Sequence, residues 1–144
     1  GNVGGLRCQN VECLSAAAAL SNIWSESRTA KWVRKETDGM TYGCRAIATS
    51  YGDVWCYLNG RGMMQGLVAR DGEVAGEITK ACFKRQLVIE TSGADDQVIK
   101  TLCPLTIREE DLVRALEIVK ESVDEVMTDR IKRGEAHSVA SITA

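Results

Sequence analysis

Lys100 is the residue whose setting in this sequence most directly raises a chemical question. It stands in DDQVIKTLCPLTI, residues 95–107, where an alternating, strand-like run places an ammonium group among apolar neighbours shortly before Pro104. The residue types alone favour an exposed lysine on the solvated face of an edge strand, with its hydrocarbon stem lying over its neighbours. An ammonium at a strand end that is directed into a pocket would instead pair with a carboxylate as a point charge. The spacing leaves both interpretations open.

The other reactive side chains lack the partners that a catalytic site needs. His137 is the only histidine and lies close to the end of the sequence, so we expect no histidine–cysteine nucleophile pair in a folded region. The six cysteines are scattered without a CxxC pair, which favours buried reduced thiols and predicts no metal site. We expect Arg61, within GRG, to form surface ion pairs beside a turn or bulge, and contact with a substrate is the alternative. Glu90, Thr91 and Ser92 are expected to end a strand, where they could line the mouth of a pocket, although a polar loop is expected at such a place in any case.

Two helices are expected in the first third of the chain. The alanine-rich run from Asn10 to about Trp24 has high helix propensity and small side chains, and we interpret it as a buried helix. Ser25 is positioned to cap a second helix, which ends near Gly52. Apolar residues at helical spacing mark one face of this second helix, namely Ala30, Val33, Met40, Cys44 and Ile47.

Strands and a further helix are expected in the middle of the chain. Residues 54–58 and 63–69 read as strands around the turn NGRG, which predicts a hairpin or adjacent antiparallel strands. Apolar residues recur at helical spacing over 73–85 and predict an amphipathic helix. The run LVIE at 87–90 predicts a short strand, and the Lys100 segment predicts another.

The last helix has the clearest pattern in the sequence. Thr106 and Glu109 have the spacing of a capping box, which predicts the start of a helix. Apolar residues then recur every three or four positions and form one stripe, namely Leu112, Leu116, Val119, Val123 and Val126. We expect the helix to end at about Met127 and the residues from Thr128 onward to fray, because they show no period.

The order of these elements indicates the fold class. A chain of 144 residues with 44% hydrophobic and 26% charged residues is long enough for one globular domain. The order predicts an α/β fold of the two-layer α+β kind, with a small mixed or antiparallel sheet and helices on one face. The net charge of -2 provides no basic field for nucleic acid, and no apolar run is long enough to cross a membrane. The cytosol is the expected compartment.

Five segments resemble the C-terminal part of class III aminotransferases, which are pyridoxal-phosphate enzymes of fold type I. They are GGLRCQNVECLSAAAAL at 4–20, GRGMMQGL at 60–67, the helix after it, LVIETSGADDQVIKTLCPLTI at 87–107, and the last helix to about Met127. They occur in family order and at family spacing. IETSGA and CPLTI are most similar to the diaminobutyrate aminotransferases of ectoine synthesis, and 4-aminobutyrate aminotransferase is a more distant likeness.

The resemblance implies a division of the chain. Residues 1–24 would be the glycine-rich segment and helix that close the large domain. Residues 25–127 would form the C-terminal small domain, and residues 128–144 a flexible tail. In this setting the small-residue face of the first helix would normally pack on a large domain. We therefore expect that face to be exposed here and to favour self-association, so the partner is a missing large domain or a second copy.

The resemblance also implies roles for three positions. In many relatives the position of Lys100 carries an arginine that grips the carboxylate of the substrate, and lysine would hold that acid more loosely because it cannot form a bidentate fork. A family threonine that binds the cofactor phosphate of the neighbouring subunit is matched here by Gly5. The backbone amides of Gly4 and Gly5 could still face a phosphate, although two such glycines are also typical of a flexible end.

The family pattern finally indicates what this sequence lacks. The Schiff-base lysine, the acid that contacts the pyridine nitrogen and the ring-stacking side chain all lie upstream in the family, and no lysine here stands in that context. One hypothesis is a portion of an aminotransferase, catalytically incomplete alone, that moves an amino group from a diamino or omega-amino acid to 2-oxoglutarate. The other is a non-catalytic binding or interaction module derived from the same fold, which Gly5 and Glu12 favour.

Overall fold

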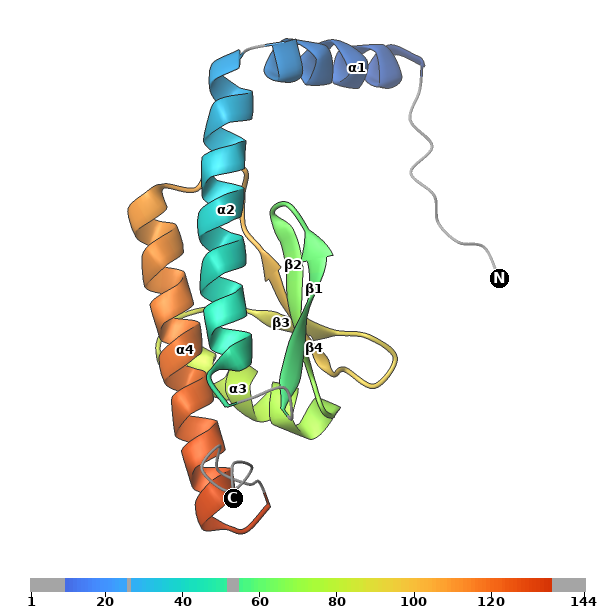
Figure 1. Ribbon diagram of the computed structural model, residues 1–144. Coiled ribbons are helices and arrows are strands. Elements are labelled where there is room, and N and C mark those ends of the chain that lie inside the picture. The colour runs from blue at the N-terminus through green and yellow to red at the C-terminus, as the bar shows by residue number, and fades with distance from the viewer. Residues whose placement is uncertain (1–9, 26, 52–54, 136–144) are drawn as a thin grey trace, which may run out of the picture.

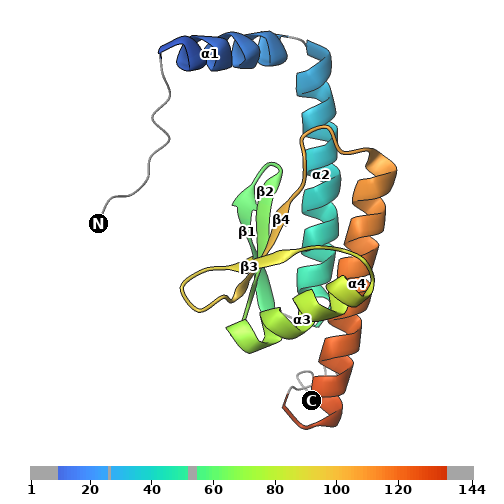
Figure 2. The same cartoon turned by 180° about the vertical axis from the view of Figure 1, so that it is seen from behind.

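The computed structural model describes residues 10–25, 27–51 and 55–135. Over these ranges the chain forms α1 (Asn10–Ser25), α2 (Ser27–Thr49), β1 (Cys56–Arg61), β2 (Met64–Ala69), α3 (Gly72–Lys84), β3 (Glu90–Ser92), β4 (Val98–Leu102) and α4 (Glu109–Lys132). The strands form one antiparallel sheet in the order β1-β2-β4-β3, so β2 and β4 are its interior strands. Figures 1 and 2 show α2, α3 and α4 on one side of the sheet, and α1 lying across the end of α2.

A tight hairpin joins β1 to β2. Only Gly62 and Met63 lie between the last paired residues of the two strands. The sequence predicts a strand over 54–58, whereas pairing carries β1 through most of the NGRG segment. Gly60 has a φ of 107°, and a Cβ at this position would lie 2.3 Å from the backbone carbonyl oxygen of Met64. Both the conformation and the space therefore require glycine at position 60.

One hydrophobic core lies between the sheet and the three helices α2, α3 and α4. Its most deeply buried side chains come from all three helices and from both interior strands, namely Met40, Cys44, Leu67, Ile78, Cys82, Ile99 and Val123. The opposite face of the sheet carries exposed Tyr57, Met64 and Leu102. This arrangement confirms the predicted two-layer fold with helices on one face of an antiparallel sheet.

Helix α1 forms where the alanine-rich run predicts it, but it is not buried. The side chains of residues 13–22 are exposed, and α1 contacts only α2 among the described elements. The prediction of a buried helix is therefore wrong within this chain, while the predicted exposure of its small-residue face is confirmed. Ser25 is the last residue of α1 and α2 begins at Ser27, so the predicted cap at Ser25 is also wrong.

Three further boundaries differ from the sequence prediction. The residue that precedes α4 is Arg108, without a side-chain capping bond, and Glu109 is already helical, so the predicted capping box does not form. The helix continues to Lys132 rather than fraying from Thr128, and residues 136–144 lie outside the described part. Strand β3 lies at Glu90–Ser92 instead of 87–90, because the apolar residues before Glu90 pack against the core without joining the sheet.

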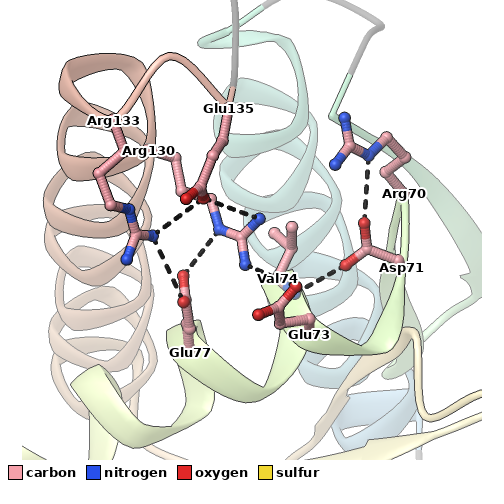
Figure 3. Close-up of polar contacts among 8 residues, drawn as sticks. All are labelled: Arg70, Asp71, Glu73, Val74, Glu77, Arg130, Arg133 and Glu135. Carbon is pink, nitrogen blue, oxygen red and sulfur yellow. Dashed lines mark hydrogen bonds and ion pairs between the residues drawn. The ribbon is translucent and has the colours of Figure 1, made fainter.

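A cluster of charged side chains holds the end of α4 against α3 (Figure 3). This Arg130 cluster consists of Glu73, Glu77, Arg130, Arg133 and Glu135. Arg130 is 4% exposed, and its Nε donates to Glu77 Oε2 at 2.7 Å. Arg133 Nη2 lies 3.4 Å from the other oxygen of Glu77 and 3.3 Å from Glu135 Oε2. These contacts join residues of α3 to the last turns of α4 and explain why that helix continues past its apolar stripe.

Candidate functional site

Lys100 lies on the face of the sheet that the helices leave open. Its neighbour Ile99 is fully buried, and successive side chains of a strand point to opposite faces. The cross-strand partners of Lys100 are Gly66 on β2 and Glu90 on β3. Since β4 is an interior strand, the interpretation of Lys100 as a residue of an edge strand is wrong, and its side chain is only 32% exposed.

The ammonium group of Lys100 already has a carboxylate partner. Its Nζ donates a hydrogen bond to Glu90 Oε2 at 3.0 Å, and the Glu90 side chain is 75% exposed. An ion pair in which one partner is this exposed contributes only about 0–1 kcal/mol to stability, because water screens the charges and both side chains lose conformational freedom. A carboxylate from another molecule can therefore compete with Glu90 at small cost. The sequence predicts Glu90 at the end of a strand, beside a polar loop or a pocket mouth, and does not predict its pair with Lys100.

A shallow hollow lies beside Lys100 on the same sheet region. It has a volume of about 210 Å³ and is lined by Asn59, Gly60, Met64, Gln65, Gly66, Val98, Lys100 and Leu102. Gly66 opens this space, because a Cβ at that position would lie 2.6 Å from Val98 Cγ1. Met64 and Leu102 are exposed and form an apolar border. The hollow thus combines one ammonium group with a small apolar surface, which suits an acid with a short hydrocarbon body.

A second cavity, with a volume of about 280 Å³, lies between the segment before β3 and the end of β4. Most of its lining is aliphatic and comes from α2, α4 and the segment before β3, including Met40, Leu87, Ile89, Leu112, Leu116 and Val119. Glu90 and Lys100 are the only charged residues of its lining. The cavity contributes apolar surface near these two residues but no additional acid, base or nucleophile.

The described lysines do not fit covalent attachment of pyridoxal phosphate. Attachment requires a lysine that is desolvated, or near another cation, so that its amine becomes neutral. Here hydrogen bonds to Glu109 and Asp124 raise the pKa of Lys35 and Lys120 above the usual value of 10.5. Lys100 and Lys132 each face a carboxylate, and the remaining described lysines, Lys31, Lys80 and Lys84, are exposed on helices. None of these side chains provides the environment of a Schiff-base lysine.

The thiols are also unsuited to nucleophilic chemistry. Burial raises the pKa of Cys44 to about 11 and that of Cys56 to about 12, so both are protonated at neutral pH. Cys44, Cys56 and Cys82 are buried and form no disulfide, as expected, whereas Cys103 is half-buried and Cys13 is exposed; Cys8 lies outside the described residues. Within the described ranges there is no group of three potential metal ligands, and no helix is long and apolar enough to cross a membrane.

Other residues singled out by the sequence are not brought to Lys100. Gly4, Gly5 and His137 lie outside the described residues, so phosphate contact by the two glycines stays a prediction. Arg61 ends β1 and is exposed, and among the described residues it has no ion pair, contrary to expectation. The neighbours that the structure does bring to Lys100 are Glu90 and Gly66, which only the strand register identifies.

Sequence comparison finds diaminobutyrate–2-oxoglutarate transaminases. The chain is 35% identical over 117 residues to the protein of Vibrio cholerae, an alignment that covers 81% of this chain and 28% of that relative. The protein of Wolinella succinogenes is 35% identical over 132 residues, covering 92% of this chain and 31% of the relative. The chain therefore spans about three tenths of the length of the curated relatives it matches. No protein-family model matches it.

Solved aminotransferases share the fold. A structure described as a co-factor free transaminase has a TM-score of 0.66 and 18% identity, covering 89% of this chain and 32% of that one. N-acetylornithine aminotransferase from Stenotrophomonas maltophilia has a TM-score of 0.61 and 22% identity, covering 73% of this chain and 29% of that one. Because sequence and fold agree, this chain belongs to the aminotransferase family that includes the diaminobutyrate–2-oxoglutarate transaminases, and it corresponds to a C-terminal portion of such an enzyme.

Proposed function

We propose that this chain is the C-terminal small-domain part of a pyridoxal-phosphate-dependent aminotransferase. The reaction proposed is amino transfer between a diamino or omega-amino acid and 2-oxoglutarate, as the names of the relatives from Vibrio cholerae and Wolinella succinogenes suggest. Pyridoxal phosphate, when bound, supplies the electron sink for such a transfer. The lysine that attaches it would come from a part of the enzyme that these residues do not include. We also propose a cytosolic location and a small domain over residues 25–127.

The observation that carries this proposal is the ammonium group of Lys100 beside the hollow. Lys100 lies at the centre of the open sheet face, and its Nζ already binds one carboxylate, that of Glu90. A substrate carboxylate is proposed to replace Glu90 on Nζ, while the space beside Gly66 accepts the adjoining carbon atoms. Lysine binds a carboxylate as a point charge, so it fixes the position of the acid less strictly than a bidentate arginine.

A chimera tests the function directly. The C-terminal portion of the Vibrio cholerae relative is replaced by this chain, and amino transfer from diaminobutyrate to 2-oxoglutarate is measured with added pyridoxal phosphate. We expect activity in the chimera and none in the 144-residue chain alone. Lys100→Met should raise the KM for the acid whose carboxylate it binds by about tenfold, the cost of one hydrogen bond to a charged group. Lys80→Met, at an exposed lysine of α3, is the matched control.

Each outcome bears on a separate part of the proposal. Equal KM values for Lys100→Met and Lys80→Met would reject Lys100 as the carboxylate partner. A folded chimera that binds pyridoxal phosphate but transfers no amino group would support the alternative of a non-catalytic module. If the 144-residue chain alone gained the visible absorbance of lysine-attached pyridoxal phosphate, the proposed incompleteness would be wrong.

A further inference from the structure

Two polar side chains lie directly behind the Lys100 site, on the side of the sheet that faces the helices. The strand register pairs Gln65 of β2 with Thr101 of β4, next to the pair formed by Gly66 and Lys100. Because side chains alternate along a strand, Gln65 and Thr101 point towards the helices while Lys100 points to the open face. Thr101 Oγ1 donates to the backbone carbonyl oxygen of Gln65 at 2.7 Å. This bond holds β4 to β2 one position away from the site.

The side chain of Gln65 connects this part of the sheet to α2. Its Nε2 donates to Thr41 Oγ1 on α2 and to the carbonyl oxygen of Gly62 in the hairpin turn, both at 2.7 Å. Thr41 Oγ1 donates to the carbonyl oxygen of Thr37 at 2.8 Å, so its single proton is used and it can only accept from Gln65. Both partners of Gln65 Nε2 are thus acceptors, and the side chain at position 65 must supply donors.

These four residues, Thr41, Gly62, Gln65 and Thr101, form a Gln65 bridge that stability alone does not explain. Gln65 is 6% exposed, and its Oε1 has no hydrogen-bond partner among the described residues. A buried acceptor without a partner costs free energy, and an apolar residue facing the core would avoid that cost. The bridge does fix β2 and β4 relative to α2, because its hydrogen bonds join all three elements and the hairpin turn.

We propose that Gln65 is a positioning residue for the carboxylate-binding ammonium group of Lys100. This inference rests on the proposed function, in which a substrate carboxylate binds Nζ while the adjoining carbon atoms lie beside Gly66. Both contacts form together only if β2 and β4 keep their relative position at this pair. Gly66 has no side chain that could hold β2 in place from the open face. The Gln65 bridge holds it from the core face and so fixes the point from which the flexible Lys100 side chain extends.

Steady-state kinetics of the chimera test this inference. Lys100→Met first identifies the acid whose KM depends on the ammonium group. Gln65→Met keeps most of the side-chain volume but removes both donated hydrogen bonds, and Thr101→Val removes the bond between β4 and β2. We expect each to raise the KM for that acid by about threefold with kcat unchanged, which is half of the free energy behind the tenfold effect of Lys100→Met.

A double variant separates positioning from a general effect on stability. In a Lys100→Met background, Gln65→Met should raise the KM no further, because a residue that acts through Lys100 then has no ammonium group to position. Ser122→Ala is the matched control, since it removes another buried hydrogen bond, from Ser122 Oγ to the carbonyl oxygen of Ile118 at 2.8 Å, away from the hollow. It should leave the KM unchanged, and urea unfolding checks that every variant is folded.

The outcomes distinguish this inference from the proposed function. If Lys100→Met leaves every KM unchanged, the role of Lys100 fails and the positioning role fails with it. If Lys100→Met raises the KM but Gln65→Met and Thr101→Val do not, only the positioning role is overturned. It is also overturned if Ser122→Ala raises the KM as much as Gln65→Met, or if Gln65→Met has its full effect in the Lys100→Met background. Should Gln65→Met not fold, Thr101→Val, which removes a single bond, decides in the same way.

Discussion

Replacement of Arg130 by methionine removes the central cation of the Arg130 cluster and keeps most of its apolar stem. The guanidinium is almost fully buried, and Figure 3 shows it between α3 and the end of α4. Its Nε lies 2.7 Å from Glu77, its Nη2 lies 3.5 Å from Glu73, and its Nη1 lies 3.7 Å from Glu135. In the variant, Arg133 is therefore the only cation of the Arg130 cluster left to pair with its three carboxylates.

The expected loss of stability depends on how exposed the remaining carboxylates are to water. Removing one partner of a fully buried ion pair costs about 3–5 kcal/mol, because the other charge is left without compensation. Here Glu77 is 29% exposed and keeps Arg133 at 3.4 Å, and Glu73 and Glu135 are more exposed still. We therefore expect a loss of about 2 kcal/mol, mainly the hydrogen bond from the guanidinium to Glu77. For a chain of this length that loss lowers the Tm by roughly 4–8 °C.

Urea unfolding, followed by the fluorescence of buried Trp55, measures this loss. The control is Arg114→Met, which breaks an exposed pair with Glu117 on the same helix and should change the free energy of unfolding by less than about 0.5 kcal/mol. If Arg130→Met were as stable as the wild type, or no less stable than Arg114→Met, the view that the cluster fixes the end of α4 would be refuted.

The pH dependence of the same comparison has a defined sign. The hydrogen bond from Arg130 lowers the pKa of Glu77 below its usual value of 4.5. A carboxyl group whose pKa is lower in the folded than in the unfolded state adds stability that is fully present above the unfolded pKa and is lost as the pH falls through the folded pKa. The difference between wild type and Arg130→Met should thus be constant near pH 7 and decrease below about pH 4.5.

Two further substitutions test other parts of the fold. Gly60→Ala should destabilise the chain by about 2 kcal/mol or more, because it combines a positive φ with a Cβ against the Met64 carbonyl oxygen. Gly62→Ala is the control, because a Cβ at position 62 has open space around it, and it should destabilise the chain less in the same unfolding assay. Leu20→Glu on exposed α1 should reduce self-association of the chain measured by light scattering, and a wild type that stays monomeric at all concentrations would contradict this prediction.

The elements that the sequence predicts well are those with local causes. Helix α3 begins where Asp71 accepts a hydrogen bond from the backbone N–H of Val74 at 2.9 Å, and its apolar spacing is sufficient to locate it. The stripe of α4 predicts that helix for the same reason. Its end is not predicted, because the bond that holds it joins Glu77 and Arg130, which are 53 positions apart. No pattern within one helix contains that information.

In the candidate site too, the sequence predicts the features that have local causes and does not predict those that depend on long-range contacts. Lys100 is conspicuous in the sequence as a cation among apolar residues, and it is the residue that we propose to bind the substrate carboxylate. Its partner Glu90 depends on the register of β3 against β4, which places residues 90 and 100 opposite each other across the loop 93–97. A shift by one residue would turn Glu90 to the core face of the sheet. The pattern LVIE predicts a strand that ends at Glu90, whereas β3 begins at Glu90. Because the predicted start of this short strand is wrong by three positions, the sequence does not predict the ion pair between Glu90 and Lys100. The sequence alone therefore identifies a lysine in an unusual setting at position 100. Whether the ammonium group of this lysine is free or already paired with a carboxylate depends on the pairing of β3 with β4.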